Sequence, residues 1–162
     1  MAHFDPGSVV WNLQSINKYD AIREIVFGVD TFRAHPSLDL DEFAGTVIER
    51  ERLQSTGFGH GVAVAHGRTS QVVSPRIALG ISRSGIEFGS PDGEPVHLLF
   101  IVANHPEHAV DYLHILSTLV SMVRDELFRR EILTCDEPTD MQQKLCSVFT
   151  ALLERNRLRF AC

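Results

Sequence analysis

Residues 55–68 have the sequence Ser-Thr-Gly-Phe-Gly-His-Gly-Val-Ala-Val-Ala-His-Gly-Arg. The three glycines at alternate positions suit a backbone that bends tightly or approaches another group closely. The apolar residues 62–65 predict a short buried strand. We expect the strand to end before His66, which would then lie in a turn with Gly67 and Arg68. An imidazole beside a guanidinium, at the end of a strand, is suited to phosphoryl or proton chemistry.

The composition is that of an ordinary globular protein. Of the 162 residues, 44% are hydrophobic and 22% are charged, which is enough apolar material for one domain with a sizeable core. The net charge of −6 argues against non-specific binding to nucleic acid, which needs a basic surface. Three cysteines without a CxxC motif favour free thiols and a cytoplasmic location. We expect no signal peptide and no membrane span.

Helix signals precede the glycine-rich stretch. Asn17 predicts the start of one helix and Asp39 the start of a second, because both residue types favour the N-cap position. Residues 31–38, which contain Pro36, are expected to form a loop between them. The second helix ends in the charged residues 49–52, which we interpret as a solvated helix end.

Strand and helix signals also follow the stretch. Residues 76–83 predict a strand, and the eight apolar-rich residues 96–103 predict the central buried strand. A helix is expected after residues 104–107, with an apolar face made by Val110, Leu113, Leu116, Leu119 and Val120. Two further helices are expected to start at Asp125 and Pro138.

These elements predict an α/β fold, in which a mixed β-sheet of about five strands is flanked by helices on both faces. We expect residues 1–17 to form an N-terminal arm, residues 18–157 the domain and residues 158–162 a C-terminal tail. Sites in such folds lie beyond strand ends, which is where this interpretation puts His66.

The segment from Arg50 to Arg68 resembles a known family. Its sequence, Arg-Glu-Arg-Leu-Gln-Ser-Thr-Gly-Phe-Gly-His-Gly-Val-Ala-Val-Ala-His-Gly-Arg, is similar to the phosphorylation-site region of type-2 EIIA domains in the bacterial sugar phosphotransferase system (PTS). This is the mannitol/fructose class, and the chain is most similar to its nitrogen-regulatory members. Residues 86–88, 92–96 and 98–100 extend the resemblance, which covers about residues 18–153.

The resemblance implies a phosphoryl-relay protein. Such domains accept a phosphoryl group on a histidine from the phosphocarrier protein HPr. They pass it to a cysteine of a IIB domain or act as phosphorylation-dependent regulators. The phosphoacceptor corresponds to His66 and the active-site arginine to Arg50. From the residue chemistry, Thr56, Gly67, Arg68 and the amide of Thr69 are further candidates for holding the phosphate.

Two positions depart from the family pattern. Ala65 replaces the proline that usually precedes the acceptor histidine. Tyr112 occupies the position of the family's second active-site histidine, and a tyrosine cannot carry a positive charge near a phosphate. His108, one helical turn earlier, is the predicted stand-in, whereas His114 should face another way.

We therefore expect a stand-alone, regulatory PTS component with phosphotransferase chemistry, no cofactor and no bound metal. One alternative is a sugar-transport IIA subunit that passes phosphate to IIB. A remoter alternative is a non-catalytic module that senses phosphorylation or binds a metal through four histidines, namely His60, His66, His105 and His108. The sequence predicts no oligomeric state, and the role of His60 stays open.

Overall fold

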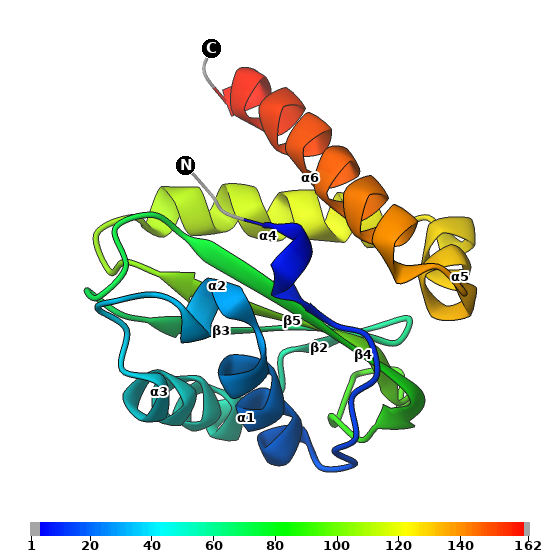
Figure 1. Cartoon of the computed structure of the whole chain (residues 1–162), viewed down its shortest axis with the longest axis horizontal. Coiled ribbons are helices and arrows are strands. Elements are labelled where there is room, and N and C mark those ends of the chain that lie inside the picture. Colours follow the sequence, from blue (N-terminus) through cyan, green and yellow to red (C-terminus); the bar gives the residue numbers. More distant parts are fainter. Residues whose placement is uncertain (1–3, 161–162) are drawn as a thin grey trace.

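The computed structural model describes residues 4–160, in which a five-stranded sheet lies between two layers of helices (Figure 1). The strands are β1 (Val9–Val10), β2 (Gly57–Gly59), β3 (Val62–Arg68), β4 (Arg76–Ile86) and β5 (Val96–Asn104). The helices are the 3-10 turn η1 (Pro6–Ser8), α1 (Lys18–Gly28), α2 (Asp30–Arg33), α3 (Leu40–Leu53), α4 (Ala109–Val123), α5 (Glu126–Thr134) and α6 (Pro138–Phe160).

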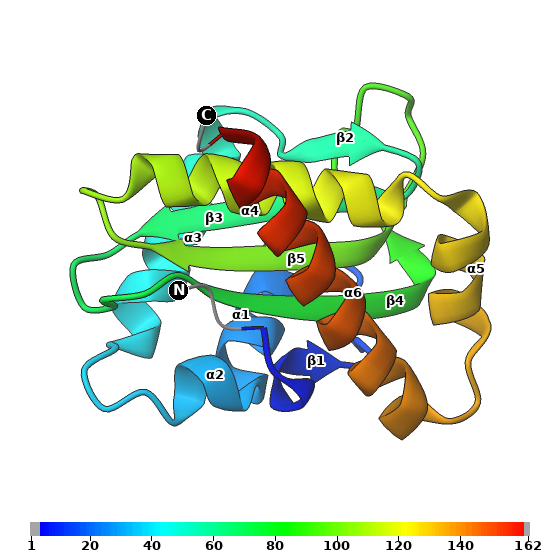
Figure 2. The same cartoon turned by 90° about the horizontal axis from the view of Figure 1, so that it is seen from above.

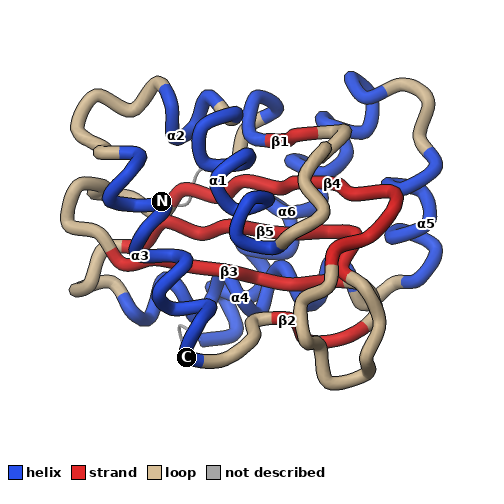
Figure 3. Tube along the Cα trace, turned by 90° about the horizontal axis from the view of Figure 1, so that it is seen from below, coloured by secondary structure: helices blue, strands red, loops and turns tan. Residues whose placement is uncertain are grey.

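The sheet is mixed, and its strand order is β1-β4-β5-β3-β2, as Figure 3 shows from below. The central strand β5 is antiparallel to β4 and parallel to β3. At the edges, β1 is parallel to β4 and β2 is antiparallel to β3. The predicted fold class and the predicted central strand are both confirmed. Val9 and Val10, which lie within the expected N-terminal arm, form the short edge strand β1.

Each face of the sheet has its own apolar core. Helices α1, α2 and α3 cover one face, and α4 and α6 cross the other, as the view from above in Figure 2 shows. Strand β3 contributes Ala63 and Ala65 to the first core and Val62 and Val64 to the second. Because side chains alternate along a strand, His66 continues the second series and faces α4.

The two predicted helix starts before the glycine-rich stretch are confirmed. The side chain of Asn17 accepts hydrogen bonds from the first turn of α1, and Asp39 accepts one from the amide of Glu42 in α3. The predicted loop at residues 31–38 is wrong at its beginning, because α2 occupies residues 30–33. The reason is tertiary: the Phe32 ring is fully buried, with its centroid 5.1 Å from that of Phe43.

The predicted apolar face of α4 is wrong in its first turn. Val110 and Leu113 are 64% and 60% exposed, whereas Ile115 and Leu119 are buried. The helix turns Tyr112 towards the sheet, and Ile115 and Leu119 follow at helical spacing on that face. Two exposed apolar side chains are therefore left on the outer side of this turn.

The later helices begin where the sequence predicts. The side chain of Asp125 accepts hydrogen bonds from the amides of Leu127 and Phe128, and α6 starts at Pro138. Leu145 and Phe149 of α6 are buried in the core that α4 also covers. Between residues 4 and 160, no helix combines the length and the apolarity needed to cross a membrane.

Candidate functional site

His66 lies within strand β3 and not in a turn. The ladder between β3 and β5 pairs His66 with Val102 and continues as far as Arg68 and Asn104. The prediction that the strand ends before His66 is therefore wrong by three residues. The cause is the parallel partner β5, which supplies hydrogen bonds to β3 beyond its apolar run. Pairing with β5 therefore holds the backbone of β3 both before and after His66 in the chain.

The outer edge of β3 is open beside His66. Strand β2 pairs only with the start of β3, and the last bond runs from the Val64 amide to the Thr56 carbonyl at 3.3 Å. The Thr69 amide donates instead to the Asn104 carbonyl on the other side, at 2.9 Å. Since amides alternate in direction along a strand, those of His66 and Arg68 point to the open edge. The Thr69 amide, a predicted phosphate donor, is already used in the sheet.

Gly67 brings helix α3 close to this edge. A Cβ atom at this position would lie 2.9 Å from Cγ2 of Val47 and 3.0 Å from Cε1 of Phe43. Only a residue without a side chain leaves room for the helix there. Arg50 lies three residues beyond Val47, at the end of the same helix. Close packing at Gly67 therefore places Arg50 near the open edge of β3.

A pocket of about 230 Å³ lies where α3 meets β3, and its lining residues are Thr46, Arg50, His66, Gly67 and Arg68. The structure thus brings together four of the residues that the sequence singled out. Two arginines and one histidine line this space, and no Asp or Glu among residues 4–160 does. Arginine side chains match the geometry of phosphate oxygens, so the pocket is chemically suited to a phosphoryl group.

The surroundings of His66 keep its ring neutral. Burial lowers the pKa of His66 to about 4, and the positive charges of Arg50 and Arg68 act in the same direction. An ordinary histidine has a pKa near 6.5. At neutral pH the ring therefore carries a lone pair on one nitrogen, which is the form that can act as a nucleophile.

Tyr112 contacts the other side of the ring. Its hydroxyl oxygen lies 3.0 Å from Nδ1 of His66, and the two ring centroids are 4.7 Å apart at an angle of 39°. Burial raises the pKa of Tyr112 above its ordinary value, so the hydroxyl stays protonated. Tyr112, which the resemblance puts at the position of the family's second histidine, is thus in direct contact with the predicted phosphoacceptor.

His108 is not in the pocket. It is the N-cap residue of α4, and its ring centroid lies 5.0 Å from that of His105. Within residues 4–160 it makes no hydrogen bond with His66. Its Nδ1 atom is buried without a hydrogen-bond partner among these residues. The predicted stand-in role of His108 has no support from a contact in this structure.

Thr56 also lies outside the pocket, and its amide and hydroxyl are both hydrogen-bonded to Glu51. The Thr56 hydroxyl donates to Oε2 of Glu51 at 2.5 Å, and its amide lies 3.1 Å from Oε1. Glu51 is only 2% exposed and forms an ion pair with Lys18 of α1 at 3.1 Å. The carboxylate of Glu51 thus joins helix α3, helix α1 and the segment before β2.

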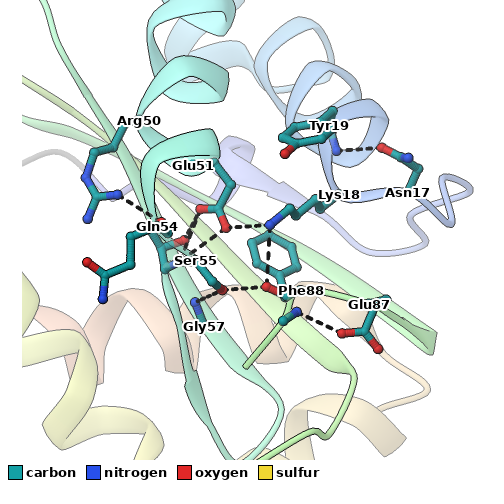
Figure 4. Close-up of polar contacts among 12 residues, drawn as sticks. Asn17, Lys18, Tyr19, Arg50, Glu51, Gln54, Ser55, Gly57, Glu87 and Phe88 are labelled. Carbon is teal, nitrogen blue, oxygen red and sulfur yellow. Dashed lines mark hydrogen bonds and ion pairs between the residues drawn. The ribbon is translucent and has the colours of Figure 1, made fainter. Parts of the chain in front are cut away.

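This buried ion pair fixes the turn that follows α3. The Ser55 hydroxyl and Nζ of Lys18 both donate to the carbonyl of Phe88, as Figure 4 shows. The same turn presents the Gln54 carbonyl, which accepts a hydrogen bond from Nη1 of Arg50 at 2.9 Å. The Glu51 carboxylate therefore orders the backbone that holds the Arg50 side chain.

His60 belongs to the tight connection between β2 and β3. It adopts a left-handed conformation with φ of 58°, between Gly59 and Gly61, which also have positive φ. Its amide donates to Oδ2 of Asp92 at 2.9 Å. His60 therefore shapes the hairpin and does not line the pocket. Within residues 4–160, no group of three or more His, Cys, Asp or Glu side chains is arranged to hold a metal ion.

A family model described as phosphoenolpyruvate-dependent sugar phosphotransferase system, EIIA 2, matches residues 2–147. The chain belongs to this EIIA type-2 family. Its general role is therefore phosphoryl transfer within a phosphotransferase system, as a IIA component.

Known relatives of this EIIA chain include both sugar-specific and regulatory proteins. It is 33% identical over 125 residues to the fructose-specific EIIABC component of Bacillus subtilis, covering 77% of this chain but only 19% of that protein. It is 32% identical over 127 residues to the nitrogen regulatory protein of Pseudomonas aeruginosa, covering 75% and 81% of the two chains. The crystal structure of nitrogen regulatory protein IIA-Ntr from Neisseria meningitidis superposes with a TM-score of 0.77 at 26% identity, over 89% and 94% of the chains.

Sequence reasoning missed one residue that organises this candidate site. Glu51 was grouped with the solvated charges at the end of α3, yet it is buried. It lies four residues after Val47 and three after Ile48, both of which are buried on the inner face of the helix. Helical spacing alone therefore puts Glu51 on the inner face, where Lys18 compensates its charge.

Proposed function

We propose that this EIIA chain accepts a phosphoryl group on His66 from a phosphorylated HPr-type carrier. One observation carries the proposal: a neutral, half-buried imidazole lines a pocket whose charged side chains, among residues 4–160, are Arg50 and Arg68. The two guanidinium groups neutralise the charge of the incoming phosphoryl oxygens. The amides of His66 and Arg68 on the open edge of β3 offer further donors to the same oxygens.

The transfer needs no general base on this chain. A lone pair of the neutral His66 ring attacks phosphorus and a nitrogen–phosphorus bond forms. The bond between phosphorus and the donor's imidazole breaks, and its electron pair returns to the donor. The reverse sequence, with the thiolate of a IIB cysteine as nucleophile, releases the phosphoryl group again. The phosphoryl group adds about −1.5 to −2 charges to this surface, which is enough to change how a partner binds.

We propose the regulatory type of IIA as the biological role. Similarity to nitrogen regulatory proteins in both sequence and structure supports this assignment. The alternative is a sugar-transport IIA component that passes phosphate to IIB, and the fructose-specific relative supports that alternative. The two roles share the same acceptor and differ in what receives the phosphoryl group or senses it.

The test is phosphorylation from purified components. The chain is incubated with phosphoenolpyruvate, the kinase of HPr and HPr, and its intact mass is measured under alkaline conditions that preserve phosphohistidine. We expect one phosphate per wild-type chain, none on His66→Ala, and one on His108→Ala, which is the matched histidine control. Absence of phosphate from the wild type would refute the proposal, and loss of phosphate only in His108→Ala would reassign the acceptor.

A second experiment separates the two roles. The phosphorylated chain is mixed with IIB proteins of the same organism, and the phosphate remaining on the chain is followed with time. The regulatory role predicts little transfer, together with binding to a protein outside sugar transport that changes when His66 is phosphorylated. Rapid and complete transfer to one IIB protein would instead establish the transport role.

A further inference from the structure

We propose that Tyr112 is a positioning residue that fixes the tautomer of His66: its hydroxyl oxygen accepts a hydrogen bond from Nδ1–H and leaves the lone pair on Nε2, which takes the phosphoryl group. This inference rests on the proposed function of His66. It gives a specific role to the tyrosine that stands where the family has a second histidine, a role that does not require a positive charge.

The side chains of Tyr112 and His66 are in direct contact. Nδ1 of His66 lies 3.0 Å from the hydroxyl oxygen of Tyr112, which is within hydrogen-bond distance, and the rings pack against each other. Tyr112 lies in the first turn of α4, where its amide donates to the His108 carbonyl at 3.2 Å. Its ring packs against the core between α4 and the sheet. The hydroxyl is therefore held in place by the helix and by packing.

The donors in the pocket decide the direction of this hydrogen bond. A neutral imidazole carries its proton on one nitrogen and a lone pair on the other, while a tyrosine hydroxyl can donate or accept. Tyr112 contacts Nδ1 and does not line the pocket, so we infer that the opposite ring edge, which carries Nε2, faces Arg50 and Arg68. Guanidinium groups have donors only, so they favour a lone pair on Nε2 over an N–H group. The proton then resides on Nδ1, and the Tyr112 oxygen accepts it.

With this tautomer, no proton has to leave or join the His66 ring during transfer of the phosphoryl group. The Nε2 lone pair forms the bond to phosphorus, and the departing donor imidazole takes the electron pair of the broken bond. Nδ1 keeps its proton and its hydrogen bond to Tyr112 before and after the step. In the opposite tautomer Nε2 would have to lose a proton, and within residues 4–160 no carboxylate or second imidazole lines the pocket to take it.

Tyr112→Phe is the test, because it removes the hydroxyl and keeps the ring that packs on His66. We expect nitrogen chemical shifts of the wild-type His66 ring to report the lone pair on Nε2, and those of Tyr112→Phe to report a mixture of tautomers. We expect phosphorylation by HPr to slow by about threefold to tenfold, the usual effect of losing one hydrogen bond. Tyr112→His, which restores a ring nitrogen as acceptor, should recover part of the rate.

Tyr19→Phe is the matched control. Tyr19 is the only other tyrosine of the chain, and it lies on α1 against the core of the opposite face. We expect this variant to keep both the wild-type tautomer and the wild-type rate. A wild-type ring with its proton on Nε2, or an unchanged tautomer and rate in Tyr112→Phe, would overturn the inference. If the wild type accepts no phosphate, the proposed function fails, while the tautomer measurement still tests the role of Tyr112.

Discussion

Gly67→Ala tests whether close packing of α3 on β3 builds the proposed phosphoryl pocket. The added methyl group would lie 2.9 Å from Cγ2 of Val47 and 3.0 Å from Cε1 of Phe43. Neither neighbour can move away easily, because a valine has few χ1 options and the phenylalanine ring is buried. Helix α3 must therefore shift away from the strand and carry Arg50 with it.

The expected cost follows from the effect of inserting a methyl group into a packed core. Such overpacking destabilises a protein by about 1–3 kcal/mol. For a domain of this size, 1 kcal/mol lowers the melting temperature by about 2–4 °C. The melting temperature of Gly67→Ala should thus fall by about 2–12 °C. Phosphorylation should slow as well, because small displacements of a positioned group reduce catalysis strongly.

The assay combines thermal unfolding with the HPr phosphorylation rate, and Gly45→Ala is the matched control. Gly45 lies in the same helix, and a Cβ atom there would meet nothing within 4 Å. Alanine at such a helical position stabilises by roughly 0.5–1 kcal/mol. We therefore expect Gly45→Ala to melt slightly higher and to be phosphorylated at the wild-type rate. A Gly67→Ala protein with wild-type stability and rate would refute the packing argument.

Three more predictions concern the charges around the pocket. Arg50→Ala should raise the pKa of His66 from about 4 towards 6.5 in an NMR titration, and it should slow phosphorylation by about 100-fold. An unchanged pKa would contradict the placement of Arg50 beside His66. Glu51→Gln should lower the free energy of unfolding, measured by urea denaturation, by about 3 kcal/mol, because it leaves Lys18 without its partner. The same change at the exposed Glu49 should alter this free energy by less than about 0.5 kcal/mol, and equal effects would argue against the buried ion pair. The pKa of His66 is lower in the folded than in the unfolded state, so between pH 6.5 and 4 only the unfolded state binds its proton. The free energy of unfolding should therefore decrease as the pH is lowered from 6.5 to 4, and it should decrease less steeply in His66→Gln; identical slopes would contradict this.

Local signals in the sequence were sufficient for the framework of the fold. The capping side chains Asn17, Asp39 and Asp125 mark helix starts that depend on neighbouring backbone amides alone. The apolar run at residues 96–103 similarly identified the central strand, because a strand buried on both faces needs apolar side chains throughout. These features involve few contacts between distant segments, so the sequence specifies them directly.

Features that depend on distant segments were not predicted. The strand continues past His66 because β5 pairs with it, and α2 forms where Phe32 packs on Phe43. The contact between Tyr112 and His66 joins residues 46 positions apart, and only the crossing of α4 over the sheet brings them together. Spacing along one helix suggested His108 as the partner, but spacing contains no information about which residue reaches across to another strand.

The burial of Glu51 could have been predicted from its helical spacing, but the charged residues around it favoured the opposite interpretation. Its helical spacing from Val47 puts it on the buried face, while its place in a run of four charged residues suggested a solvated end. The decisive fact is the position of Lys18, which is 33 residues away and supplies the compensating charge. A buried carboxylate is stable only with such a partner, and the partner is known only from the fold.

The central claim is that His66 receives the phosphoryl group, and locating the phosphate within the chain tests it most directly. After reaction with phosphorylated HPr, the wild-type chain is digested at alkaline pH and its peptides are fragmented by mass spectrometry. All eight histidines of the chain are then compared. We predict that the phosphate resides on His66 alone. Phosphate on any other histidine, with His66 unmodified, would contradict the account.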